Sequence, residues 1–214
     1  MTLNLDNKGL KSITNEFELF FIDIWGVVHN GIKLFQNSIN VLNELERNKK
    51  EYVLLTNAPR PNSDVIKFLK KMGLDDDKCQ KVYTSGEAAL KHLNSKWKNS
   101  KFFHIGPPRD FNLFKMFEKN KVKNTDEAEL LLCTGLFDNY DKDLDFYKNL
   151  LKNKIDKKMI CTNPDLVVDR GEEREFCAGS VAKVFEELGG KVDYFGKPYR
   201  LVYTQSIEIK KKRI

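Results

Sequence analysis

Long apolar segments are missing from this sequence of 214 residues. The most apolar stretch, from Leu19 to Val28, is interrupted by Asp23, so it falls short of the roughly 18–20 apolar residues that a membrane-spanning helix needs. The N-terminal segment has no basic region leading into an apolar one, which is the pattern of a secretory signal peptide. We therefore expect no membrane partner and a cytoplasmic location.

Cysteine is scarce and widely spaced. The four cysteines stand at positions 79, 133, 161 and 177, and no two of them form a Cys-x-x-Cys pair. A disulfide framework or a structural zinc site usually needs more cysteines or closer spacing. This pattern indicates isolated thiols in a reducing compartment.

The excess of basic residues is small and scattered along the chain. Lysine and arginine number 37 against 31 acidic residues, which gives a net charge of +6. Nucleic-acid-binding proteins usually concentrate basic residues on one face and interleave aromatic side chains. We therefore favour a solvated lysine-rich surface and expect no nucleic-acid partner. A nucleic-acid-associated protein is a minor alternative, which salt-dependent binding to DNA or RNA would support.

The sequence does contain a regular alternation of short apolar strands and amphipathic helices. Hydrophobic residues make up 41% of the chain, enough for a core despite the charged fraction of 32%. Strands are expected near residues 18–28 (with the following turn), 52–55, 82–84, 102–105, 130–133, 159–161 and 192–195. Helices are expected near 37–48, 63–72, 85–93, 111–117, 144–151, 178–188 and 199–209. This alternation predicts an α/β protein with mostly parallel strands.

Polar residues stand where several expected strands end. Asp23 interrupts the first strand, Thr56 and Asn57 follow the second, and Lys197 lies in a Gly-Lys-Pro turn after the last. Ligands of parallel sheets bind beyond the carboxyl ends of the strands. A carboxylate, a hydroxyl, an amide and an ammonium are the groups needed to transfer a phosphoryl group to a carboxylate. Each residue alone also has a structural interpretation, such as capping the next turn.

Six motifs follow one another in a fixed order along the chain. They are FFIDIWGVVHNG, LLTNAPRP, TSGEAA, CTNPDLVV, CAGSVAKVFEELGG and FGKPY. Together, over residues 17–203, they resemble the haloacid dehalogenase (HAD) superfamily, and more narrowly its NagD-like class IIA branch. The resemblance implies a HAD-type Rossmann-like parallel sheet core, formed by residues 1–97 and 189–214. In the family's own numbering of catalytic motifs, FFIDIWGVVHNG is the first, LLTNAPRP the second and FGKPY the third, and an α/β cap, residues 98–188, would be inserted between the second and the third.

The resemblance also implies the catalytic residues. Asp23 would be the nucleophile that forms an aspartyl-phosphate. Its carboxylate would bind Mg²⁺ together with the backbone carbonyl of Trp25. Lys197 would offset the negative charge of the nucleophile and the phosphate.

Four further residues are implied to contact the phosphate or the substrate. Thr56 and Asn57 would hold the phosphoryl oxygens. Asn163 and Asp165, in the cap, would form part of its substrate-facing wall. The alternative for these two cap residues is an ordinary turn between a strand and a loop.

The function implied by the resemblance is magnesium-dependent hydrolysis of a small phosphorylated metabolite. Members of the family act on nucleotides, sugar phosphates, glycerol phosphate and pyridoxal phosphate, and all four classes stay open. The alternative is a non-catalytic relative that binds a phosphorylated ligand or a protein partner. A phosphatase assay with and without Mg²⁺ separates these two, and a homodimer is compatible with either.

One departure from the family pattern lies in the first motif. The family usually has Asp-x-Asp, and its second aspartate serves as general acid and base. Trp25 stands in that place, and an indole N–H does not exchange a proton at neutral pH. Losing acid–base help typically costs about 10²–10⁴-fold, so we expect slow or absent hydrolysis of ordinary monoesters. His29 is a candidate substitute, although a turn histidine is the favoured interpretation.

The other departure concerns the fourth motif. In the family, a stretch like the final KKKRI continues into an apolar strand that ends in Gly-Asp and supplies an acidic metal ligand. The sequence stops at Ile214. We therefore expect a core that is incomplete at the C-terminus, with an exposed strand edge around Asp23.

Overall fold

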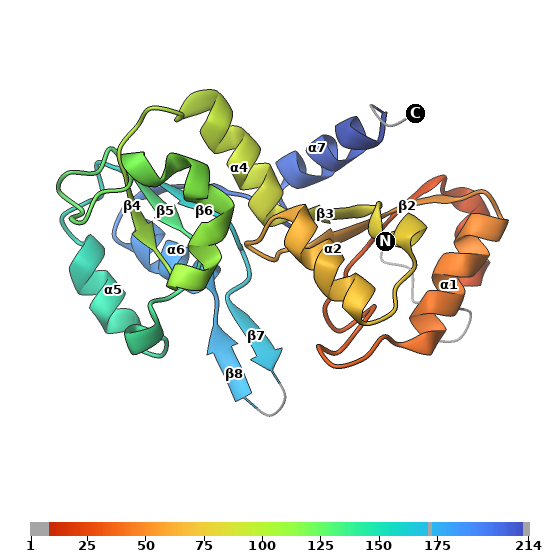
Figure 1. Ribbon diagram of the computed structural model, residues 1–214. Helices are drawn as coiled ribbons and strands as arrows, with labels where there is room; N and C mark the ends of the chain where they lie inside the picture. Colours follow the sequence, from red (N-terminus) through yellow and green to blue (C-terminus); the bar gives the residue numbers. More distant parts are fainter. Residues whose placement is uncertain (1–8, 171–172, 212–214) are drawn as a thin grey trace. The chain divides into compact units, whose positions relative to one another are not determined.

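The computed structural model describes residues 9–170 and 173–211, and the chain divides into two compact units. The first unit is formed within residues 1–56 and 66–83, and the second within 57–65 and 84–214 (Figure 1). Both contain parallel strands and helices, which confirms the predicted α/β class. The predicted break in the family pattern at Ile214 lies outside the described residues.

The first unit contains a three-stranded sheet in the order β1-β2-β3. Its strands are β1 (Leu19–Ile22), β2 (Glu51–Thr56) and β3 (Val82–Thr84, whose last residue is assigned to the second unit). Its helices are α1 (Gln36–Arg47), α3 (Asp76–Cys79) and the part of α2 (Asn62–Lys71) from Ile66 onward. Two short 3₁₀ turns, Leu10–Ser12 and Thr14–Glu16, precede β1. The central strand β2 is apolar and buried from Tyr52 onward because it has a neighbour on each side. Helix α1 packs on β2 and buries Leu42 and Leu45.

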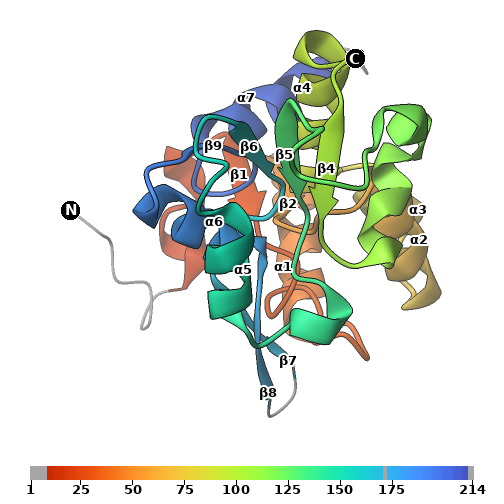
Figure 2. The ribbon, with the colours of Figure 1, turned by 90° about the vertical axis from the view of Figure 1, so that its left-hand side faces the viewer.

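The second unit contains a four-stranded parallel sheet in the order β4-β5-β6-β9. Its strands are β4 (Phe102–Ile105), β5 (Leu130–Cys133), β6 (Lys158–Cys161) and β9 (Lys191–Tyr194). Its helices are α4 (Ser85–Lys96), α5 (Leu144–Leu151), α6 (Ala178–Glu187) and α7 (Arg200–Lys211), with 3₁₀ segments η3 (Pro108–Asn120) and η4 (Asp138–Tyr140). Helices α5 and α6 lie together on one face of this sheet (Figure 2).

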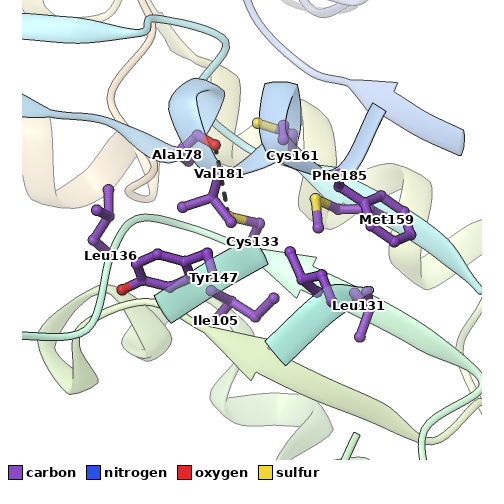
Figure 3. Close-up of a cluster of buried hydrophobic side chains, with 12 residues drawn as sticks. Ile105, Leu131, Cys133, Leu136, Tyr147, Met159, Cys161, Ala178, Val181 and Phe185 are labelled. Carbon is purple, nitrogen blue, oxygen red and sulfur yellow. Dashed lines mark hydrogen bonds between the residues drawn. The ribbon is translucent and has the colours of Figure 1, made fainter. Parts of the chain in front are cut away.

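A cluster of buried side chains joins that sheet to α5 and α6 (Figure 3). Cys133 of β5 and Cys161 of β6 lie opposite each other on neighbouring strands. Both lie among the apolar side chains of the cluster, such as Tyr147 and Phe185. Burying each large apolar side chain stabilises the fold by about 1.5–3 kcal/mol. The chain's four cysteines, all within the described residues, are buried and form no disulfide.

An antiparallel hairpin, β7 (Val167–Arg170) and β8 (Glu173–Phe176), projects from the second unit (Figure 1). The side chains of Asp169 and Arg174 form an exposed ion pair across it, with Nε and Oδ1 2.7 Å apart. The sequence analysis did not predict this hairpin, because its strands carry charged residues rather than an apolar run. No described helix is long and apolar enough to cross a membrane.

The last strand lies elsewhere than the sequence analysis placed it. Residues 189–214 were expected to join residues 1–97 in the core, but β9 pairs in parallel with β6, where Val192 lies opposite Met159. β9 pairs with the edge of β6 that faces away from β5. Helix α6 packs on β9 as well as on β5 and β6. Phe21 and Leu131 do lie in different sheets, so the second half of the chain has a sheet of its own.

Candidate active site

Asp23 and Thr56 lie at the same edge of the first sheet. Asp23 directly follows β1, and Thr56 is the last residue of β2. The two strands are parallel with Ile22 opposite Leu54, so both residues lie at the carboxyl ends of their strands. Thr56 is buried and Asp23 is half-buried. The structure thus places a carboxylate and a hydroxyl where parallel sheets bind ligands.

The chain turns sharply after Asp23, and Trp25 covers this turn. The backbone N–H of Gly26 donates to the carbonyl of His29 at 2.8 Å. The indole ring of Trp25 packs edge-on against the imidazole of His29, with centroids 5.3 Å apart. A Cβ atom on Gly31 would lie 2.9 Å from the indole. Trp25 therefore has a packing role at the position where the family has a carboxylate.

His29 is buried beneath this turn. Its Nδ1 accepts the backbone N–H of Gly31 at 2.8 Å, which leaves the ring proton on Nε2 in the neutral form. Burial lowers the pKa of His29 below its ordinary value, although nearby Asp23 opposes this. A neutral imidazole has no extra proton to donate at pH 7. The structure therefore favours a structural role for His29 in this turn over a role as the acid that replaces the missing aspartate.

In the second unit, Asn57 joins two loops that the sequence analysis singled out. Its Nδ2 donates to Asp165 Oδ1 at 2.8 Å and to the carbonyl of Lys197 at 3.1 Å. Its Oδ1 accepts the backbone N–H of Lys197 at 2.7 Å. Because both ends of this buried amide are engaged, Asn57 positions the loop that carries Lys197.

Glycine is required beside Asn57. Gly196 has a φ of 131°, and a Cβ there would lie 2.6 Å from both Asn57 Oδ1 and Pro164 Cδ. Its absence lets the Gly-Lys-Pro turn approach the amide closely. The Lys197–Pro198 peptide bond in this turn is cis.

The loop that carries Asn163 and Asp165 is anchored at the N-terminus of α6. The backbone N–H of Asp165 donates to Asn163 Oδ1 at 3.0 Å. The carbonyl of Asp165 accepts the N–H of Gly179 at 3.1 Å, and Ser180 Oγ donates to the carbonyl of Leu166 at 2.6 Å. The structure thus brings Asn57, Asn163, Asp165 and Lys197 together through hydrogen bonds.

The segment after Asn57 is clamped to the start of α4. The carbonyl of Ala58 accepts from the Oγ of Ser85 and from the N–H of Gly86, and Thr84 Oγ1 donates to the carbonyl of Arg60 at 2.6 Å. A Cβ on Gly86 would lie 2.6 Å from the Arg60 nitrogen, so only glycine permits this contact. The TSGEAA motif therefore holds the backbone of Arg60 in place.

A pocket of about 250 Å³ opens beside these loops in the second unit. Arg60, Asp110, Thr134 and Asn163 are among its lining residues. Sequence reasoning missed Arg60 and Asp110. Arg60 lies within LLTNAPRP, where only Thr56 and Asn57 received roles, and Asp110 follows no motif.

The donor atoms near Asp23 suit a hard metal ion. Within residues 9–170 and 173–211, no group of three or more histidine, cysteine, aspartate or glutamate side chains gathers as a metal site. Magnesium needs fewer protein ligands, because it is commonly held by one or two carboxylates with water and substrate phosphate. The carboxylate of Asp23 and the backbone carbonyl of Trp25 are hard oxygen donors of this kind. Their chemistry fits magnesium better than zinc.

Comparisons with known proteins identify relatives of the chain. The model of the haloacid dehalogenase-like hydrolase family matches residues 20–118. A haloacid dehalogenase-like hydrolase from Brucella suis is 30% identical, with a TM-score of 0.84 over 95% of this chain and 78% of that one. A 4-nitrophenylphosphatase from Thermotoga maritima is 26% identical, with a TM-score of 0.68 over 94% and 76%. A nagD-type protein is also 26% identical, with a TM-score of 0.68 over 94% and 78%. No curated protein matches the chain.

The parallel α/β fold of the chain is shared with these solved structures. With a relative of 30% identity that the chain covers over 78% of its length, the chain belongs to the haloacid dehalogenase-like hydrolases. It is an enzyme of the NagD-like class IIA branch, which confirms the resemblance seen in the motifs.

Proposed function

We propose that this hydrolase is a magnesium-dependent phosphatase that acts on a small phosphorylated metabolite through an aspartyl-phosphate at Asp23. The observation that carries the proposal is the placement of Asp23 directly beyond β1, at the same sheet edge as Thr56. The similarity to a 4-nitrophenylphosphatase supports the reaction class. We further propose that residues of the second unit serve as the cap.

In the proposed reaction, a carboxylate oxygen of Asp23 attacks phosphorus and the bond to the leaving oxygen breaks. A water molecule then attacks the phosphorus of the aspartyl-phosphate, the bond from phosphorus to the Asp23 oxygen breaks, and the free carboxylate is released together with phosphate, which carries away the protons of the water. Bound Mg²⁺ would supply positive charge that offsets the phosphoryl oxygens. Thr56 would donate its hydroxyl to one of these oxygens, and Lys197 would stabilise their charge.

The proposed roles of Asn57, Asn163 and Asp165 follow from their hydrogen bonds. Asn57 fixes the backbone of Lys197, so it acts on catalysis by positioning that ammonium. Asp165 accepts from the amide of Asn57 through its carboxylate and donates its backbone N–H to Asn163 Oδ1, and these bonds would hold the substrate-facing loop in one conformation. Preorganised groups of this kind need no rearrangement as charge develops.

Trp25 sets the expected substrate preference. A leaving group that departs as a stable anion needs no proton, whereas an alkoxide does. Because the side chain of Trp25 cannot supply that proton, we expect 4-nitrophenyl phosphate to react faster than an alkyl phosphate.

The test is a phosphatase assay of the full chain with 4-nitrophenyl phosphate, with Mg²⁺ and with EDTA. Turnover should require Mg²⁺ and fall by about 10³-fold or more in Asp23→Asn, which keeps the shape but removes the nucleophile. Asp77→Asn, at an exposed aspartate of α3, is the matched control and should retain the native rate. Phosphate binding without turnover would instead favour the non-catalytic alternative.

A further inference from the structure

The sequence contains a single Asn-Gly pair, Asn30-Gly31, in the turn that follows Asp23. Asn30 is exposed on the first unit, and Gly31 is half-buried. An asparagine that precedes glycine is chemically labile, because the backbone nitrogen of the glycine is unshielded by a side chain and can attack the asparagine amide. The proposed phosphatase reaction gives neither residue a role.

The backbone nitrogen of Gly31 has a base fixed beside it. Its N–H donates to His29 Nδ1 at 2.8 Å, and this nitrogen of a neutral imidazole can accept a proton. His29 is only 3% exposed, and its ring packs against the rings of Trp25 and Phe68, with centroids 5.3 and 5.4 Å away. Most backbone N–H groups in a folded protein donate to a carbonyl oxygen, which is too weak a base to take the proton. The nitrogen next to Asn30 is therefore placed for activation as a nucleophile.

The side-chain carbonyl of Asn30 is polarised by two donors. Its Oδ1 accepts the backbone N–H of Ile32 and that of Lys33, each at 3.0 Å. Two N–H donors on one carbonyl oxygen stabilise the negative charge that develops there when a nucleophile adds to the carbon. Among the described residues none forms a hydrogen bond to Asn30 Nδ2, so nothing in this part of the chain holds the leaving nitrogen back.

The same hydrogen bonds keep the two reacting atoms together. The ring closed by the bond from the Ile32 N–H to Asn30 Oδ1 runs through both Asn30 Cγ and the Gly31 nitrogen. The side chain is therefore folded over the backbone of Gly31 instead of rotating freely in solvent. Gly31 has a φ of 90°, a conformation that glycine adopts without strain. Restricting the reacting groups in this way raises the rate of an intramolecular attack.

We propose that this turn catalyses the deamidation of its own Asn30. The Gly31 nitrogen attacks Asn30 Cγ while its proton passes to His29 Nδ1. The bond from Cγ to Nδ2 breaks, the proton is returned to the leaving nitrogen, and ammonia departs. The product is a five-membered succinimide. Water then adds to one of its two carbonyl carbons and opens the ring, which leaves aspartate or isoaspartate at position 30.

The modification changes the structure of the turn. The succinimide has no N–H at position 31, so the hydrogen bond to His29 Nδ1 is lost. Isoaspartate in addition lengthens the main chain by one atom, inside a turn in which the N–H of Asn30 donates to the carbonyl of Lys33 at 3.3 Å. The chain thus carries, a few residues after Asp23, a modification site that needs no second enzyme.

The test follows the peptide that contains Asn30 by mass spectrometry while the full chain is incubated at a fixed neutral pH. Incubation in water labelled with heavy oxygen marks only the product that forms before digestion. The folded chain should convert Asn30 at least about tenfold faster than the chain unfolded in urea, since a general base typically contributes about 10²–10⁴-fold. Asn99 is an internal control, because its neighbour Ser100 donates its N–H to the carbonyl of Trp97 and not to a base. Folding should give Asn99 no such advantage.

Two variants distinguish a catalytic His29 from a purely structural one. His29→Asn keeps an acceptor oxygen for the Gly31 N–H but cannot take the proton, so conversion should slow at least about tenfold. His92→Asn, at a mostly buried histidine of α4, is the matched control and should keep the native rate. Near-UV circular dichroism checks that both variants are folded.

Two results would overturn the proposal. One is a folded chain that converts Asn30 no faster than the unfolded chain, a comparison that uses the native sequence and does not depend on the folding of a variant. The other is a folded His29→Asn variant that converts Asn30 at the native rate. Neither measurement involves phosphate esters, so the outcome is independent of the proposed phosphatase function.

Discussion

The side-chain oxygen of Asn57 accepts the backbone N–H of Lys197 at 2.7 Å, although 140 positions separate the two residues. The nitrogen of the same amide donates to the carbonyl of Lys197 and to Asp165. A single buried side chain thus holds two loops that are distant in sequence.

Asn57→Asp should break this connection with little change of shape. The carboxylate keeps the acceptor for the Lys197 N–H but loses both donated bonds and faces Asp165 with like charge. We expect the free energy of unfolding to fall by about 2–4 kcal/mol, measured by urea titration. The turnover of 4-nitrophenyl phosphate should fall as well. Asn153→Asp, at an exposed position, should change neither quantity, and a native-like Asn57→Asp variant would contradict the positioning role.

Gly196→Ala should destabilise the chain more than the matched change Gly189→Ala. Both residues have positive φ, but a Cβ on Gly189 meets nothing within 4 Å. A Cβ on Gly196 would lie 2.6 Å from Asn57 Oδ1 and from Pro164. We expect a difference in unfolding free energy of about 1–3 kcal/mol between the two variants. Equal losses would mean that backbone strain alone matters at position 196.

Acid should destabilise the protein partly through His104. Burial lowers the pKa of His104 to about 3, and its Nε2 lies 2.7 Å from Thr134 Oγ1. In the unfolded chain, His104 binds a proton near pH 6.5, whereas in the folded chain it stays neutral until about pH 3. The contribution of neutral His104 to the free energy of unfolding is therefore complete above pH 6.5 and is lost as the pH falls towards 3. The slope contributed by this histidine approaches about 1.4 kcal/mol per pH unit.

Urea unfolding of the native chain and of His104→Gln, measured from pH 7 to pH 4.5, checks this expectation. The glutamine variant should show a shallower dependence, since carboxylates and the other histidines contribute equally to both curves. Parallel curves would place the acid sensitivity elsewhere.

Phe185→Ala should be among the most damaging substitutions in the second unit. The ring of Phe185 is fully buried in the cluster of α5, α6 and the four-stranded sheet. Removing it leaves a cavity that typically costs about 3–5 kcal/mol. Met116→Ala, at a side chain that is 61% exposed, is the control and should cost much less. Thermal denaturation of both variants measures the difference, and a similar loss for the two would contradict the assigned core.

The sequence predicted the elements with continuous apolar runs most accurately. Three predicted elements coincide with β4, β5 and α5, namely the strands at 102–105 and 130–133 and the helix at 144–151. They could be predicted because the apolar residues that each of them buries lie close together in the sequence. Helix α4 was expected to begin near residue 85, and the residue before it is its N-cap. This residue is Thr84, with its hydroxyl accepting the N–H of Glu87.

Long-range relationships were harder to predict. Parallel strands carry no local sign of their neighbour, so the pairing of β9 with β6 was missed. The apolar runs before Asp23 and Thr56 were enough to predict that both residues lie at strand ends. The positioning role of Asn57 and the pairing of Arg60 with Asp110 depend on contacts between distant segments.

Because the cysteines are buried, the reactivity of their thiols can be used to follow the unfolding of each unit separately. Cys79 lies in the first unit, whereas Cys133 and Cys161 lie in the second. Burial raises the pKa of Cys133 to about 12 and that of Cys161 well above its ordinary value, so neither is a reactive thiolate in the folded chain. An alkylating reagent can therefore modify these thiols only when their surroundings unfold. Pulsed alkylation followed by peptide mass spectrometry would time the unfolding of the two units separately, without any introduced probe.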